Sequence, residues 1–338
     1  MPRKKRHRVA NMGQGHDLKT RDDRPVEILE RGEIFMFYRP KVDREEAHGP
    51  DDVQRLYIVL RPESGERPVE EKQDPLSGKE GSKKQESGDN SGERVGASEG
   101  GHGSQEVNIE KEPLLRLLVM GKKSLPDPSK RSRPFWGFVE MVATRIDDVK
   151  EALRGEDYDT LTRGHRHTTE ARAVGEGIYR ILRHKSAGKG KSSSRNHTHL
   201  VYKLEFPRED EKNEPQHFLN IEREASFLIQ IKNPDQGGGV SGSSSSRFRG
   251  LQSKRRAAFP AHLQGGFGQR GFCPADPPDF LNYEGCEFLL IAASDDVEEE
   301  LGLELETESS SCSDLMRMFE MEDDSTAILR PLLRGTWA

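Results

Sequence analysis

The sequence predicts an α+β fold that is mainly β, with antiparallel or mixed sheets, a few short helices and disordered insertions. Segments of strand length that are rich in branched and aromatic residues outnumber segments with a helical pattern. The composition adds a second constraint, because 33% of the 338 residues are charged and only 32% are hydrophobic. Such a chain is too polar to fold throughout, so we expect ordered strands that alternate with polar tracts.

Eight segments have the length and the residue types of β-strands. They are 33–38, 55–60, 114–120, 135–143, 176–183, 197–206, 225–231 and 286–293. The segments 34–38 and 114–120 are apolar on both faces, which is typical of central strands that are covered on both sides. Runs of strands with only occasional helices favour an α+β or mainly β fold over alternating βαβ units.

Helical segments are fewer and have clear ends. Asp147 can cap a short helix that ends before Gly155, and Ser294 can cap another that ends before Gly302. In the stretch 254–264, Pro260 is better placed as the first residue of a new turn than inside one helix.

The polar tracts suggest how the chain is divided. We expect a basic disordered tail at 1–28, a β-rich core domain at 29–305, an acidic and mostly flexible tail at 306–338, and disordered insertions at about 62–112, 186–196 and 234–249. These tracts contain few large apolar side chains, so burial cannot offset the entropy lost on ordering. The acidic tail contains an exception at 312–321, an amphipathic pattern that suits either a partner's groove or docking onto its own domain.

Charge and cysteine content narrow the partners and the location. The net charge of −6 provides no overall attraction to nucleic acid or to an acidic membrane, and neither is expected as a partner. Three cysteines without C-x-x-C spacing, in a chain without a signal segment, favour a reduced intracellular location. A basic cluster near the start resembles a nuclear localisation signal and predicts the nucleus, with a solvated tail in the cytoplasm as the alternative. Its residues are Arg3, Lys4, Lys5, Arg6 and Arg8.

The strand at 197–206 carries the best candidate site. Its alternation places Leu200 and Tyr202 on the core face and His197, His199 and Glu205 on the opposite face. We expect the two imidazoles to project together toward solvent or a cleft, where they could bind a ligand, a metal or a proton.

A second H-x-H pair, His165 and His167, extends this to a possible metal site. Glu205 and Glu222 could complete a nitrogen and oxygen shell for a divalent metal such as zinc. The alternative is surface histidines that form hydrogen bonds across a sheet. No complete motif for any other cofactor accompanies these residues.

Two arginines form a candidate anion site. Arg39 and Arg61 each follow an apolar strand and precede a proline that ends it. If both lay at one end of the sheet they could clamp an anion, whereas the alternative is pairing with acidic residues of the 43–52 loop.

Several short segments carry a resemblance to known proteins. They are 31–34 (Arg-Gly-Glu-Ile), 38–40 (Tyr-Arg-Pro), 51–55 (Asp-Asp-Val-Gln-Arg), 197–200 (His-Thr-His-Leu), 220–222 (Asn-Ile-Glu), 231–234 (Ile-Lys-Asn-Pro), 276–278 (Asp-Pro-Pro) and 282–285 (Asn-Tyr-Glu-Gly). Together they resemble a widespread family of uncharacterised proteins, some of which carry a BTB/POZ-type label. The sequence has no helix-rich pattern of a BTB/POZ domain, and the resemblance implies no activity, cofactor or catalytic residue.

Two functions are compatible with these observations. The first, which we favour, is an intracellular, nuclear module that binds or scaffolds protein partners through its surface. The second is a metal-dependent, hydrolase-like enzyme that uses the histidine-bearing face of the sheet.

Overall fold

A computed structural model describes most of the predicted core. It covers residues 15–21, 26–65, 67–74, 103–130, 132–162, 164–185, 196–208, 213–237, 251–252, 255–307, 313–319 and 327–338. The predicted localisation signal at 3–8 lies outside these described residues, as do parts of each predicted insertion.

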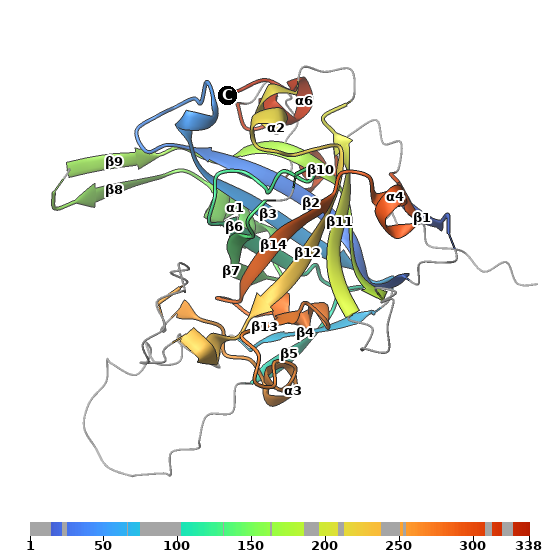
Figure 1. Cartoon of the computed structure of the whole chain (residues 1–338). Coiled ribbons are helices and arrows are strands. Elements are labelled where there is room, and N and C mark those ends of the chain that lie inside the picture. The colour runs from blue at the N-terminus through green and yellow to red at the C-terminus, as the bar shows by residue number, and fades with distance from the viewer. Residues whose placement is uncertain are drawn as a thin grey trace, which may run out of the picture.

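Eight antiparallel strands close into a barrel (Figure 1). Their order around the barrel is β11-β10-β2-β3-β6-β7-β14-β12, and β12 pairs back with β11. The strands are β2 (Val26–Pro40), β3 (Val53–Glu63), β6 (Leu115–Met120), β7 (Phe135–Ala143), β10 (Arg172–Lys185), β11 (Asn196–Phe206), β12 (Glu224–Lys232) and β14 (Glu287–Ser294). Each of them overlaps one of the eight predicted segments, so the prediction of a mainly β fold is confirmed.

Shorter elements surround the barrel. Three pairs of short strands are β1 (His16–Lys19) with β15 (Leu303–Glu306), β4 (Val69–Gln73) with β5 (Ser104–Asn108), and β8 (Glu156–Thr160) with β9 (Gly164–Thr168). The short strand β13 (Phe272–Pro274) forms an antiparallel pair with β12. The helices are α1 (Ile146–Leu153), α2 (Glu214–Phe218), α3 (Ala261–Gly265), α4 (Val297–Leu301), α5 (Asp314–Met318) and α6 (Arg330–Arg334), with 3-10 turns η1 (Pro50–Asp52), η2 (Pro234–Gly237) and η4 (Pro278–Asn282). No helix within these described ranges is long and apolar enough to cross a membrane.

The predicted helix ends are close to the observed ones. Helix α4 starts later than expected, because the Asp296 carboxylate, and not Ser294, accepts the Glu299 N–H at 2.7 Å. It ends at Gly302, whose φ of 64° is the left-handed conformation that glycine adopts easily. Helix α3 follows Pro260, as the sequence predicts.

Side chains fill the barrel. An eight-stranded barrel has an interior just wide enough for its inward-facing side chains. Here Ile34, Tyr202 and Phe227 belong to the interior cluster and are almost fully buried, and the Tyr202 and Phe227 rings stack at 6.2 Å. At one end, α2, α6 and the C-terminal residues cover the opening, with the Tyr38 hydroxyl donating to the Ala338 carbonyl at 2.9 Å.

The other end of the barrel is closed by a buried polar network around Arg116. This side chain is 0% exposed, and its guanidinium donates to both oxygens of Glu30 at 2.6 and 2.8 Å and to Asn282 at 2.6 Å. Glu30 also accepts the Tyr179 hydroxyl at 2.6 Å, and Asn282 donates to Glu70 at 3.1 Å. The network therefore joins strands β2, β4, β6 and β10 to the η4 turn.

Two predicted disordered tracts contain ordered structure. The expected insertion at 62–112 contributes the β4–β5 hairpin, and the expected flexible tail at 306–338 contributes α5 and α6. The hairpin could not be predicted from composition because its charged residue Glu70 is buried. Glu70 forms an ion pair with Arg67 at 2.8 Å and accepts a hydrogen bond from Asn282. Polarity alone therefore underestimates order where charges are paired inside the fold.

Replacing Arg116 by Met should strongly destabilise the fold. The change leaves the Glu30 carboxylate in the barrel without its opposite charge, which costs about 3–5 kcal/mol of unfolding free energy. Urea unfolding followed by circular dichroism measures this loss. Adding Glu30→Gln should restore part of it.

The matched control is Arg255→Met, which removes an exposed ion pair with Glu140. It should cost less than about 1 kcal/mol. Equal losses from the two arginine variants would contradict the role assigned to the network.

Candidate functional site

The histidine strand has the predicted core face, but its other face is covered. His199 is 3% exposed beneath α4, with its Nδ1 atom 2.9 Å from the Ser226 hydroxyl and 3.8 Å from Glu300. The expectation that both imidazoles project into solvent or a cleft is therefore wrong for His199. The reason is that Val201 on the same face packs with α4 and β15, which seal this side of the barrel.

Burial sets the protonation of His199. Burial, helped by the nearby His184 and His197 rings, lowers the pKa of the imidazole to about 3. The His199 ring is buried and lies at hydrogen-bond distance from the Ser226 hydroxyl, so it is a structural group here.

The other predicted metal ligands lie in different places. His165 and His167 are on the β8–β9 hairpin, which projects from the barrel (Figure 1). Glu205 lies beside Glu176, whereas Glu222 is exposed on the loop before β12 and lines a small hollow. The structure therefore does not bring the six predicted residues together.

The predicted anion clamp is not formed either. In the antiparallel β2–β3 pair, Arg39 faces Arg55 while Arg61 faces Glu33, so the two arginines lie toward opposite ends. Arg39 donates to the carbonyls of Ala152, Arg154 and Thr169 at 2.8–3.0 Å and so fixes the end of α1. Arg61 forms an ion pair with Glu33 at 2.7 Å at the edge of a surface hollow.

The structure instead draws attention to a short segment on the outer face of the barrel, residues 313–319, which includes α5. Leu315 is fully buried, and the Phe319 ring stacks on Phe37 at 6.1 Å beneath the Lys150 ammonium group. The amphipathic pattern was compatible with a partner's groove or with docking onto its own domain. The described segment docks onto its own domain.

A buried carboxylate holds the start of α5. Glu176 accepts the N–H of Asp314 at 2.6 Å, the N–H of Leu315 at 3.4 Å and the hydroxyl of Ser313. The two N–H groups belong to the first turn of the helix, which has no intrahelical partners for them, and the hydroxyl belongs to its N-cap residue. Burial raises the pKa of Glu176 to about 7, against the lowering effect of the hydrogen bonds from Ser313 and Leu315.

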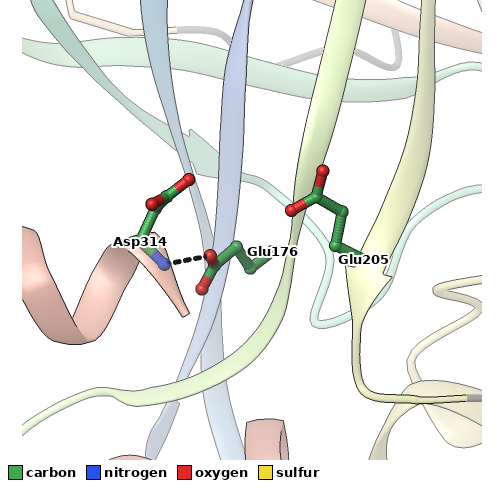
Figure 2. A group of neighbouring side chains, drawn as sticks. All are labelled: Glu176, Glu205 and Asp314. Atoms are coloured by element: carbon green, nitrogen blue, oxygen red, sulfur yellow. Dashed lines mark hydrogen bonds between the residues drawn. The ribbon is translucent and has the colours of Figure 1, made fainter. Parts of the chain in front are cut away.

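Three carboxylates meet at this point (Figure 2). Oxygens of Glu176 from β10, Glu205 from β11 and Asp314 from α5 all lie within 4.8 Å of one another. Arg317 forms an ion pair with Asp314 within the same segment. Like charges at this separation repel, and the Arg317 guanidinium, which pairs with Asp314 and also lowers the pKa of Glu176, offsets part of that repulsion.

Surface hollows flank the docked segment on two sides. The larger, about 910 Å³, is lined by Glu33, Arg61, Asp314 and Arg317 among others. The smaller, about 390 Å³, is lined by Phe37, Lys150 and Phe319 among others. Burial raises the pKa of Glu33 to about 7 despite the Arg61 guanidinium, with Glu63 and Glu176 adding repulsion. Among the described residues, the 313–319 segment therefore borders a surface hollow on each side.

Sequence reasoning did not single out Glu176 or the two aspartates opposite the exposed histidines. Glu176 is the first residue of a predicted strand that contains several large apolar residues. A carboxylate at such a position needs a partner inside the fold, and this is the signal that could have identified it. Asp157 and Asp159 have a D-x-D spacing that mirrors the H-x-H spacing of His165 and His167 across a short turn.

Comparisons with protein-family models, curated proteins and solved structures find no match to this chain. The resemblance to a widespread family therefore stays a prediction. The function has to be inferred from the side chains of this chain.

Lowering the pH should reveal the burial of His199. Its pKa is lowered in the folded state, so the unfolded chain binds a proton first and stability falls as pH decreases from about 6.5 toward the folded value. Between about pH 7 and pH 4.5, the wild-type chain should lose about 2 kcal/mol more than a His199→Gln variant. Urea unfolding at both pH values measures the difference, and parallel losses would contradict the burial.

Removing the Glu176 carboxylate should loosen α5. Glu176→Ala leaves the first-turn donors without an acceptor, which costs about 1.5 kcal/mol and raises the open population of the segment about tenfold. Trypsin cleavage after Arg317, followed by mass spectrometry, measures this opening. The exposed Glu304→Ala variant is the control and should leave the cleavage rate unchanged.

Proposed function

We propose that this protein is a protein-binding module that captures a short amphipathic helix on the outer face of its barrel. The binding surface is the α5 groove, defined here by Phe37, Lys150 and Glu176 together with the two flanking hollows. The basic run at 3–8 supports a partner in the nucleus.

The occupant of the groove suggests what the partner looks like. The segment 313–319 provides two apolar anchors, Leu315 and Phe319, spaced four residues apart on one helical face. Its first-turn N–H groups donate to the Glu176 carboxylate, and a negative charge is favourable at the N-terminus of a helix. The matching partner is a short helix with a hydroxyl N-cap and apolar residues at these spacings.

The observation that carries the proposal is the poor match of the segment to its groove. Asp314 places a third carboxylate against Glu176 and Glu205, and α5 is only five residues long. A partner helix with a neutral or basic residue at this position avoids the repulsion and can extend into the flanking hollows. The partner helix can therefore replace the protein's own segment.

A labelled peptide with the sequence of residues 312–321 tests this exchange. In the full chain, Leu315→Asp with Phe319→Asp undocks the internal segment but leaves Phe37, Lys150 and Glu176 in place. This double variant should bind the peptide at least about tenfold more tightly than the wild-type chain, because no internal competitor remains. Fluorescence anisotropy measures the affinity, after circular dichroism has shown that the variant folds.

Two matched peptides make the test specific. A peptide with D314K should bind more tightly than the natural sequence, since it removes the repulsion at Glu176 and Glu205. A peptide in which Leu315 and Phe319 are both replaced by Asp should not bind. Failure of the folded double variant to bind either the natural or the D314K peptide would overturn the proposal.

A further inference from the structure

The hydroxyl of Ser313 lies at the contact between α5 and the barrel. Ser313 is only 1% exposed. Its hydroxyl donates to the Glu176 carboxylate and its Oγ atom accepts the Met316 N–H at 3.2 Å, which makes Ser313 the N-cap residue of α5. One serine side chain therefore both starts the helix and docks it onto the barrel.

The surroundings of this hydroxyl are acidic. Figure 2 shows the carboxylates of Glu176, Glu205 and Asp314, which come from three different elements and approach one another within 4.8 Å. Arg317 pairs with Asp314 and supplies one positive charge against these three groups. A serine hydroxyl fits here because it is neutral and can donate a hydrogen bond to a carboxylate.

A phosphoryl group on Ser313 would reverse both of these properties. It adds a charge of about −1.5 to −2 at pH 7 and replaces the donated proton by acceptor oxygens, so that it repels neighbouring carboxylates. The N–H groups of Asp314 and Leu315, which could otherwise donate to a phosphate, already donate to Glu176. A side chain that is 1% exposed also has no space for the added atoms. The docked position of the 313–319 segment is therefore incompatible with a phosphate on Ser313.

We propose that Ser313 is a phosphorylation site whose modification releases the 313–319 segment from the α5 groove. A serine kinase transfers the γ-phosphoryl group of ATP, so that a bond forms between Ser313 Oγ and phosphorus while the bond to the β-phosphate oxygen breaks. ADP leaves, and the hydroxyl proton passes to a base of the kinase. The consequence for a partner helix rests on the proposed function, whereas the release of the segment can be measured without a partner.

The burial of Ser313 decides when this reaction occurs. A kinase reaches the hydroxyl only when the segment is open, so phosphorylation traps the open state. A partner helix in the α5 groove also keeps the segment open. Partner binding and phosphorylation therefore favour each other, and this coupling is reciprocal. The surrounding sequence includes Asp314, Glu320 and Glu322, so the kinase is one that accepts an acidic substrate.

Phosphoserine incorporated at position 313 of the full chain during translation tests the release. Hydrogen–deuterium exchange of residues 313–319, followed by mass spectrometry, should become as fast as in the undocked Leu315→Asp, Phe319→Asp variant. Ser313→Ala removes the N-cap without adding charge and should speed exchange only about fivefold over the wild-type chain. Phosphoserine at the exposed Ser129, whose hydroxyl donates to Asp127 at 2.7 Å, is the matched control and should leave exchange of 313–319 unchanged.

A reversed charge beside Ser313 tests whether repulsion causes the release. Glu205→Lys gives the phosphate an opposite charge while Glu176 still accepts the first-turn N–H groups. In the chain with phosphoserine at 313, this variant should slow exchange of the segment about tenfold. Exchange in the phosphoserine chain that is no faster than in Ser313→Ala would overturn the inference.

Incubation of the full chain with ATP and a nuclear extract tests the modification itself. Mass spectrometry should find phosphate on Ser313, and it should appear about tenfold faster in Glu176→Ala, which opens the segment, than in the wild-type chain. The Glu304→Ala variant should match the wild-type chain. Absence of phosphate from Ser313 of the Glu176→Ala variant would also overturn the inference, whereas failure of the peptides to bind overturns the proposed function and leaves these results unaffected.

Discussion

The buried guanidinium of Arg116 is the constraint on which the closed end of the barrel depends. A charge that is fully removed from water must be matched by opposite charge and hydrogen bonds, and Glu30 and Asn282 supply them. Meeting that requirement brings β2, β6 and the η4 turn together, and Glu70 of β4 joins through Asn282. The β4–β5 hairpin is thus held beneath the barrel by polar contacts.

The strands could be predicted because they follow a local rule, whereas their closure could not. All eight barrel strands overlap segments that were recognised by their branched and aromatic content, and the Gly302 end of α4 followed from helix termination. The pairing of β11 with β12 depends on contacts between distant segments, which alternation does not encode. The β4–β5 hairpin was missed because the burial of Glu70 is visible only once Arg67 and Asn282 are beside it.

The candidate sites show the same division between local and distant information. Alternation along 197–206 correctly separated the core face from the other face, but it could not indicate that α4 covers His199. The H-x-H pair of His165 and His167 can be found in the sequence, whereas its pairing with two aspartates depends on the register of the β8–β9 hairpin. Glu176 became significant only when the 313–319 segment, far along the sequence, was found against it. Residue types identify which groups need partners, and the fold decides which partners they find.

Barrel closure also affects how freely this chain can change in length. A sheet that closes on itself gives most of its strands two neighbours, so few backbone groups remain to recruit a strand from another molecule. A longer connection between neighbouring strands, such as 186–195 between β10 and β11, then costs little beyond the entropy of closing the loop. That cost grows by only about 0.6 kcal/mol for each doubling of length. These connections can therefore change greatly in length while the eight strands are retained, and foreign sequences inserted there should be tolerated.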